Sequence, residues 1–520
     1  MTKLIKTYWI DRYDHILSLE EVEKVDLMSI VDVKDSLALQ EKFLNEEERL
    51  WAFVKAWIEV MQVHQIKLFI RKDGLNDHVP ISAEQQAVYD WLDKASIIDI
   101  ALNAQGMQRL EAILKLGVRE ILTVTIQAND NLLKTGFDMA LFMQNIEQPT
   151  LEKLLDQTGV YCLNEFEEEG FWEEVEDIVI EYQQRKAKIS GAVFGMAIGD
   201  GLGYPAEFLK REEIQAKLLE NGFLHPDDAF IQVTDDTQMA LAVAKAVYHC
   251  EDLEPAPLEE SLRKYFIEWL NDPTNNRAPG MTCLASCERL EKGLSWLEAT
   301  DKSSKGCGAN MRVLPVGFFS FSEEVIPEVA QFQAAITHGH PTALVASELT
   351  AITVYKLLNG TTPDQLLNDL LAYAEGQKSN YYEDYLQQLW DRPPFRTPQE
   401  FIQLGWEECV DKLKAVQKGL SKIDENVDPC AIGGAGWTAE ESFATALYCF
   451  LLSPENPIKV LQNAICTSGD SDSIACLAGG FVGAYLGFDA LPANRVQNIE
   501  YQQELWEVVN YEWMNYLSNS

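Results

Sequence analysis

A chain of 520 residues with a formal net charge of −40 repels phosphate backbones, which excludes a nucleic-acid scaffold as its partner. Hydrophobic residues make up 47% of the chain, enough for the cores of two or three globular domains. The ten cysteines lack paired metal-type spacing, and no apolar segment has the length of a signal peptide or a membrane span, so we expect a cytoplasmic protein with reduced thiols and no membrane partner.

Residues 1–185 combine helical and alternating hydrophobic patterns, which predicts a mixed α+β domain. No chemical motif stands out in this acidic half, and its role is open. The predicted elements are helices over 39–65, 107–116 and a connecting 165–182, with strands over 66–70 and 120–126.

Residues 186–520 change in character, because helical periods dominate and strand signals are few. We therefore expect a multidomain chain in which an all-α domain of roughly ten or more helices follows the mixed one. The predicted helices cover 186–202, 236–250, 257–271, 281–296, 325–336, 341–358, 363–375, 398–420, 438–452, 456–465 and 473–486.

The segment 468–474 places Asp470, Asp472 and Ser473 directly before the long apolar run 474–486. Small residues recur every four positions along that run and again along 191–199. Glycine inside a helix costs about 1 kcal/mol against alanine, so two such stripes predict two backbones packed very close together. Oxygen ligands beside both helices indicate a site for a hard cation. The small residues are Gly191, Gly195, Gly199, Ala475, Gly479, Gly483 and Gly487.

A second oxygen-rich segment, Thr234-Asp235-Asp236-Thr237, precedes another amphipathic helix. One capping residue is enough for a helix start, and adjacent carboxylates repel each other unless a cation or donors neutralise them. A shared metal site therefore explains the two acidic segments better than two separate helix caps.

Three further segments and a histidine carry candidate site residues, each with a structural alternative. Glu207 follows the glycine-rich 199–203, which is also typical of a helix stop. Asn310 lies in a glycine-containing loop that could simply enter a helix. Gly434, Gly436 and Trp437 precede a helix N-terminus where they could bind a diphosphate and a base, although 438–441 also fits a capping box. His338 serves equally well as a core or as a substrate-binding residue.

Taken in order, these segments resemble the ADP-ribosylglycohydrolase family over about 187–487. The resemblance implies an all-α fold with two Mg²⁺ or Mn²⁺ ions. It places Thr234, Asp235 and Asp236 on one side of the metals and Asp470, Asp472 and Ser473 on the other, with serine where the family often has threonine. It also implies that Glu207 lies near the metals, and that Asn310, the glycine loop (433–436) and Trp437 line the ADP-ribose cleft.

The expected function is a hydrolase that removes ADP-ribose from a modified protein by cleaving the bond at the anomeric ribose carbon. The metals would grip the ribose hydroxyls and position a water, and Asp236 or Glu207 would take its proton. An alternative is an immunity or binding protein whose residues 1–185 neutralise an ADP-ribosyltransferase toxin or another basic protein. A third is a relative that has lost catalysis; the intact set of ligands argues against it.

Overall fold

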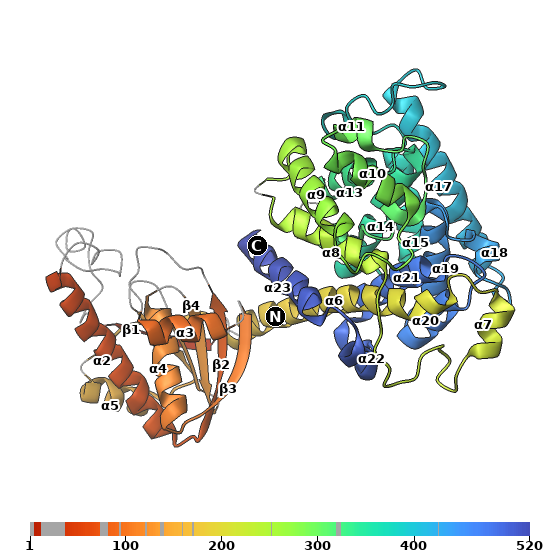
Figure 1. Ribbon diagram of the computed structural model, residues 1–520. Helices are drawn as coiled ribbons and strands as arrows, with labels where there is room; N and C mark the ends of the chain where they lie inside the picture. Colours follow the sequence, from red (N-terminus) through yellow and green to blue (C-terminus); the bar gives the residue numbers. More distant parts are fainter. Residues whose placement is uncertain are drawn as a thin grey trace. The chain divides into compact units, whose positions relative to one another are not determined.

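The computed structural model describes residues 5–11, 37–72, 82–92, 95–119, 122–129, 131–135, 140–158, 160–168, 171–250, 252–318, 324–424 and 426–519. The chain divides into two compact units, Met1–Gln183 and Gln184–Ser520 (Figure 1). Among the described residues, no helix is both long enough and apolar enough to cross a bilayer.

The first unit contains a seven-stranded antiparallel sheet with strand order β3-β2-β4-β5-β6-β1-β7. Its strands are β1 (Ile5–Asp11), β2 (Gln65–Lys72), β3 (Ala95–Ala101), β4 (Leu122–Ala128), β5 (Asn131–Thr135), β6 (Leu141–Gln144) and β7 (Tyr161–Glu168). Its helices are α2 (Leu37–Met61), α3 (Ala83–Trp91), α4 (Ala104–Val118) and α5 (Gln148–Thr158).

Side chains alternate between the two faces of each strand, so one face of the sheet can pack against the helices in a common core. Ile66, Leu68 and Ile70 point to the same face of β2 and are buried with apolar residues of α2, α4 and α5. The predicted strand over 66–70 is confirmed as β2, and the one over 120–126 is confirmed as β4 from Leu122 onward, since residues 120 and 121 lie outside the described residues. The expected helix over 165–182 is wrong at its start, because Glu165–Glu168 belong to β7 and pair with β1, more than 150 residues earlier.

The second unit is mostly helical. Its helices are α6 (Phe171–Gly203, which begins before the unit boundary), α7 (Arg211–Lys217), α8 (Asp235–Tyr248), α9 (Pro255–Leu270), α10 (Met281–Glu291), α11 (Trp296–Ala299), α12 (Leu314–Phe318), α13 (Val325–Ala335), α14 (Pro341–Leu358), α15 (Pro363–Gln377), α16 (Glu383–Leu386), α17 (Pro398–Leu420), α18 (Cys430–Gly433), α19 (Ala439–Leu452), α20 (Pro457–Ile465), α21 (Ser471–Leu486), α22 (Ala493–Asn498) and α23 (Gln502–Asn519), with 3₁₀ turns η2 (Tyr204–Ala206), η3 (Cys307–Ala309) and η4 (Phe488–Ala490).

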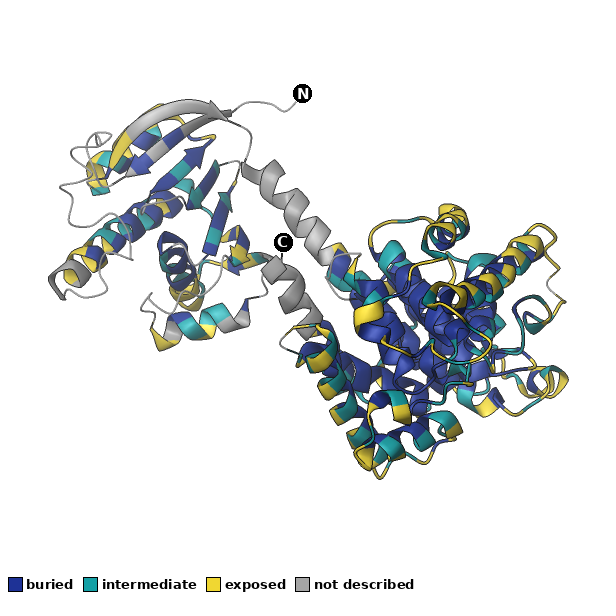
Figure 2. Cartoon of the chain, turned by 90° about the horizontal axis from the view of Figure 1, so that it is seen from above, coloured by how far each residue is buried: buried dark blue, intermediate teal, exposed yellow. Residues whose placement is uncertain are grey.

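The core of this unit surrounds α14, which packs against α12, α13, α17, α19 and α21. Figure 2 shows the buried residues gathered at the centre of the unit and the exposed ones at its rim. The helix expected over 281–296 ends early, as α10 at Glu291, and the short α11 begins only at Trp296. Gly293 lies between them with φ +83°, a left-handed conformation that ends a helix.

The glycine stripes of α6 and α21 meet as predicted. A methyl group built on Gly195 would overlap the carbonyl oxygen of Gly479, and one on Gly483 would overlap that of Gly191. The stripe continues to Gly203, where a Cβ would lie 2.6 Å from the Cα of Asp472. The absence of side chains therefore brings the end of α6 directly against the acidic start of α21.

Candidate functional site

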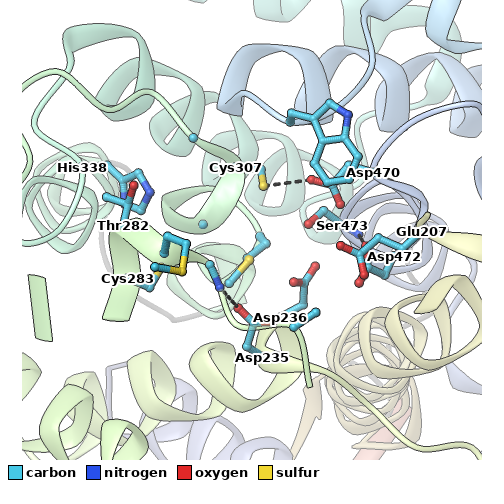
Figure 3. Close-up of a pocket in the computed structure, with 17 residues that line it drawn as sticks. Glu207, Asp235, Asp236, Thr282, Cys283, Cys307, His338, Asp470, Asp472 and Ser473 are labelled. Carbon is cyan, nitrogen blue, oxygen red and sulfur yellow. Dashed lines mark hydrogen bonds between the residues drawn. The ribbon is translucent and has the colours of Figure 1, made fainter. Parts of the chain in front are cut away.

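A pocket of about 230 Å³ opens in the second unit where the segment after η2, the start of α8 and the start of α21 converge. Five carboxylates line it, together with Ser473, Cys307, His338 and Trp437, and its lining residues include no lysine or arginine. The carboxylates are those of Glu207, Asp235, Asp236, Asp470 and Asp472 (Figure 3).

Asp200, in the last turn of α6, holds the start of α8 in place. Thr234 donates its backbone N–H and its hydroxyl to the Asp200 carboxylate, at 3.0 Å and 2.7 Å. Thr237 donates its own backbone N–H and hydroxyl to the same carboxylate, at 3.1 Å and 2.5 Å. These four bonds fix the first turn of α8, so that Asp235 and Asp236 line the pocket. Asp200 was not among the predicted site residues, although it is the acid that ends the first glycine stripe.

Thr234 itself is fully buried and caps α8, since its hydroxyl accepts the backbone N–H of Asp236 at 3.3 Å. Thr234 therefore acts as a helix cap, which is the structural alternative to a role as metal ligand. Thr234 does not line the pocket, and its role as a metal ligand stays a prediction.

The start of α21 supplies the facing acids. The backbone N–H of Asp470 donates to the carbonyl of Ala435 at 2.8 Å, which ties this segment to the glycine loop. The Oδ1 of Asp472 accepts the backbone N–H of Ser473 at 2.9 Å. Glu207, Asp470 and Asp472 each offer an oxygen within 4.8 Å of the other two, the arrangement expected around one cation.

Burial and mutual repulsion raise the pKa values of this cluster. Burial, followed by repulsion from Asp472, raises the pKa of Glu207 to about 9 and that of Asp200 to about 7. Burial likewise raises the pKa of Asp235 to about 8. Among the described residues, Glu207 Oε2 and Asp236 Oδ2 are buried with no hydrogen-bond partner. A divalent cation would satisfy these oxygens and favour the ionised form of every carboxylate, so the residues present fit such an ion.

Two exposed aromatic rings lie at the rim of this site. Phe208, next to Glu207, and Trp437 stack with ring centroids 6.2 Å apart and an interplanar angle of 18°. They are 73% and 46% exposed, an unusual state for large apolar side chains that are already paired. Trp437 was predicted, whereas Phe208 was missed; its position beside a candidate catalytic residue was the available signal.

His338 lies on the side of the pocket away from Glu207 and Asp472 (Figure 3). It is 2% exposed, and its Nδ1 lies 2.8 Å from the hydroxyl of Thr337. Burial and the nearby Arg312 guanidinium lower the pKa of His338 to about 3, so its imidazole is neutral at physiological pH. The structure thus brings His338 to the pocket as an uncharged ring.

Asn310 is fully buried, and its amide is occupied within the core. Its Nδ2 donates to the carbonyl of Ala439 and the hydroxyl of Ser442, while its Oδ1 accepts the hydroxyl of Thr350 at 2.7 Å. It does not line the pocket. These bonds connect η3 to α19 and α14, which makes Asn310 a support for the neighbouring loop in this structure.

Gly434 and Gly436 give the glycine loop its shape. Their φ angles are +119° and +88°, which residues with a side chain rarely adopt. A Cβ on Gly436 would lie 3.0 Å from the Cβ of Asp470. Neither glycine lines the pocket, but together they bring Trp437 to its rim and Ala435 against Asp470.

The fold and the pocket define a class: a mostly helical protein that gathers carboxylates from three segments around one pocket, with no lysine or arginine among the lining residues. The particular family follows from comparison: the model of the ADP-ribosylglycohydrolase family matches residues 181–518, and this chain belongs to that family. The predicted resemblance is thereby confirmed, and the match begins only at residue 181.

Similar proteins span the same region. Human ADP-ribosylhydrolase ARH3 is 25% identical over 350 residues, which cover 61% of this chain and 90% of the relative. ADP-ribosylhydrolase ARH1 of Dictyostelium discoideum is 23% identical over 369 residues, covering 61% and 91%. An uncharacterized protein of Archaeoglobus fulgidus is 27% identical over 328 residues, covering 62% and 94%. A solved structure described as an ADP-ribosylglycohydrolase-related protein complex has a TM-score of 0.45 and 20% identity, covering 64% and 99%.

Proposed function

We propose that this protein is a metal-dependent hydrolase that releases ADP-ribose from a modified protein side chain, or from a related ADP-ribosyl compound, by cleaving the bond at the anomeric ribose carbon. Family membership supports the hydrolase class. The observation that carries the proposal is the convergence of five carboxylates from three segments on one pocket.

Asp235, Asp236, Asp470 and Asp472 would hold two Mg²⁺ or Mn²⁺ ions, together with the hydroxyls of Thr234 and Ser473. When bound, such ions orient the ribose hydroxyls and a water molecule and lower the pKa of that water.

The proton of the attacking water goes to a carboxylate of this chain. Glu207 and Asp236 are the candidates, because each lines the pocket and keeps one buried oxygen without a hydrogen-bond partner among the described residues. The base must be ionised, so the high pKa of Glu207 has to fall when cations and substrate occupy the site. Amide variants of each residue distinguish the two assignments.

The remaining groups bind the substrate or orient the carboxylates of the site. The stacked rings of Phe208 and Trp437 offer a flat apolar surface at the pocket rim, which suits the planar base of ADP-ribose. The neutral imidazole of His338 contributes a wall and a hydrogen-bonding nitrogen without adding charge. Asp200 acts through α8 by fixing the orientation of Asp235 and Asp236.

The test is release of free ADP-ribose from arginine-linked and serine-linked peptides, with Mg²⁺, Mn²⁺ or a chelator. We expect cation-dependent release from one linkage, lost in Asp235→Asn and Asp472→Asn and slowed in whichever of Glu207→Gln and Asp236→Asn removes the base. Release that is unchanged by the chelator would overturn the metal-dependent mechanism. Failure to release ADP-ribose from either peptide, with cations demonstrably bound, would overturn the choice of a protein side chain as acceptor.

A further inference from the structure

One side chain at the pocket does not suit a site built only for hard cations. Cys307, in η3, is held by its backbone N–H, which donates to the carbonyl of Trp437 at 3.1 Å. Its Sγ lies 2.9 Å from Oδ2 of Asp470, with the thiol donating to the carboxylate (Figure 3). A sulfur atom therefore lies in contact with an oxygen assigned above to a metal.

A second observation at the same pocket points to a ligand. Asp236 is 3% exposed, lines the pocket with Cys307, and keeps its Oδ2 without a partner among the described residues. A thiol and two carboxylates from η3, α8 and α21 thus face one space.

The other thiol of the pocket provides a contrast. Cys283 Sγ lies 3.7 Å from Nη1 of Arg312, a guanidinium buried in the core. A fixed positive charge beside a sulfur atom repels an incoming cation. Of the two pocket cysteines, Cys307 is the one whose sulfur makes a hydrogen bond to a carboxylate, whereas the sulfur of Cys283 contacts a guanidinium.

We propose that Cys307, with Asp470 and Asp236, binds a thiophilic divalent cation of the Zn²⁺ class in competition with Mg²⁺ or Mn²⁺. The proposal rests on the proposed cation site, since it shares these two carboxylates with it. Thiolate ligands select soft and borderline ions, and Zn²⁺ binds mixed N, O and S sites more tightly than Mn²⁺. As the metal–sulfur bond forms, the thiol proton passes to the solvent buffer and the bond to Asp470 opens.

The consequence is a site whose occupant depends on which ion is present. Hard ions use the carboxylate oxygens and leave the thiol as a hydrogen-bond donor to Asp470. A thiophilic ion binds the sulfur together with Asp470 and Asp236, so these two carboxylates no longer bind the ions of the proposed reaction. Zn²⁺ is therefore expected to inhibit, in competition with Mg²⁺ or Mn²⁺.

The test uses Cd²⁺ alone as the probe on the full-length metal-free protein, without substrate. We expect ultraviolet sulfur-to-metal charge-transfer absorption that saturates with Cd²⁺, is lost in Cys307→Ser and is retained in Cys283→Ser. Removing an outer-shell partner of a metal already costs about 10- to 100-fold in affinity, so loss of the sulfur ligand is expected to weaken Cd²⁺ binding by at least that range. Mg²⁺ in excess is expected to raise the apparent Kd for Cd²⁺.

X-ray absorption of the unaltered protein loaded with one equivalent of Zn²⁺ gives a second readout that needs no variant. One sulfur at about 2.3 Å with oxygen or nitrogen neighbours is expected. A zinc coordination shell without sulfur would overturn the proposal. So would a sulfur-to-Cd²⁺ charge-transfer band that persists in Cys307→Ser. ADP-ribose release is assayed separately, so hydrolysis without a sulfur signal defeats only this inference, and a sulfur signal without hydrolysis defeats only the proposed function.

Discussion

Gly195 of α6 and Gly479 of α21 lie against each other so closely that neither position can hold a side chain. A methyl group on Gly195 would overlap the carbonyl oxygen of Gly479, and one on Gly479 would overlap the carbonyl oxygen of Gly195. This reciprocal backbone contact places Asp200, in the last turn of one helix, near Asp472 at the start of the other; burial and then the charge of Asp472 raise the Asp200 pKa. The geometry of the acidic pocket therefore depends on two residues that lie outside it.

Gly195→Ala is expected to lower the free energy of unfolding by about 3 kcal/mol, at the upper end of what overpacking a core costs. The overlap is with backbone atoms, which cannot rotate away. Chemical denaturation of the purified protein measures the change. Gly376→Ala is the matched control, because Gly376 lies in α15 with nothing within 4 Å of a built Cβ. That control should be unchanged or slightly more stable; equal losses at both positions would contradict the packing argument.

Asp200→Asn is expected to weaken divalent-cation affinity by about 10- to 100-fold, the range typical of residues that support metal ligands. The carboxylate accepts hydrogen bonds from four donor groups, the backbone N–H and the hydroxyl of both Thr234 and Thr237, and an amide nitrogen in place of one oxygen would face donors. Calorimetric titration with Mn²⁺ measures the loss. Thr237→Val removes one hydroxyl donor and should have a smaller effect. Unchanged affinity in Asp200→Asn would show that the start of α8 is fixed by other contacts.

Stability of the metal-free protein is expected to fall as pH rises from about 5 to about 9. Burial raises the pKa values of Asp200, Asp235 and Glu207 to about 7, 8 and 9, so the folded state binds more protons than the unfolded state across this window. Ionised carboxylates bind cations better than protonated ones. The increase in Tm produced by Mn²⁺ should therefore grow with pH, and should disappear in Asp236→Asn and Asp472→Asn. A cation effect that is independent of pH would argue against this cluster as the binding site.

Glu348 provides a pH effect away from the pocket. It is fully buried in α14, where burial raises its pKa to about 7 although Tyr373 and Gln331 donate hydrogen bonds to it. A raised carboxyl pKa costs stability as pH rises from the unfolded value toward the folded one, here by up to about 3 kcal/mol between pH 4.5 and 8.

Glu348→Gln should remove that part of the pH dependence. Gln331 can accept from the new amide by rotating, because its Oε1 has no partner among the described residues. Unfolding free energies measured at several pH values should show wild type and variant diverging as pH rises, with the variant the more stable above pH 7. Parallel curves would contradict a raised pKa at Glu348.

Phe208→Ala is expected to raise the Kd for ADP-ribose by about two- to tenfold, which corresponds to the roughly 0.5–1.5 kcal/mol of an aromatic pair. The ring is 73% exposed, so folding stability should hardly change. Calorimetric titration with ADP-ribose measures the effect. Phe230→Ala is the matched control, since Phe230 is 64% exposed and does not line the pocket. Equal affinity in the two variants would remove Phe208 from the binding surface.

Local sequence patterns were enough to predict the helices of the second unit and the order of its acidic segments along the chain. Amphipathic periods marked most of its helices, and glycines spaced by four predicted the contact between α6 and α21, because spacing of four along a helix defines one face. The secondary structure of residues 1–185 was harder to predict from the sequence. The end of β7, Glu165–Glu168, was predicted as helix because its strand character comes from pairing with the distant β1, and sheet pairing of this kind leaves little trace in a local window.

The residue types at the candidate site could be read from the sequence, because carboxylates, hydroxyls and glycines before helix starts carry their chemistry locally. Only the tertiary structure decided which side chains share the pocket. It brought Phe208 and Cys307 to Trp437 and Asp470, and it occupied the amide of Asn310 inside the core. It also showed Asp200 supporting α8. Those contacts join segments 34 to more than 200 residues apart, and their geometry depends on how closely two glycine faces allow the helices to pack.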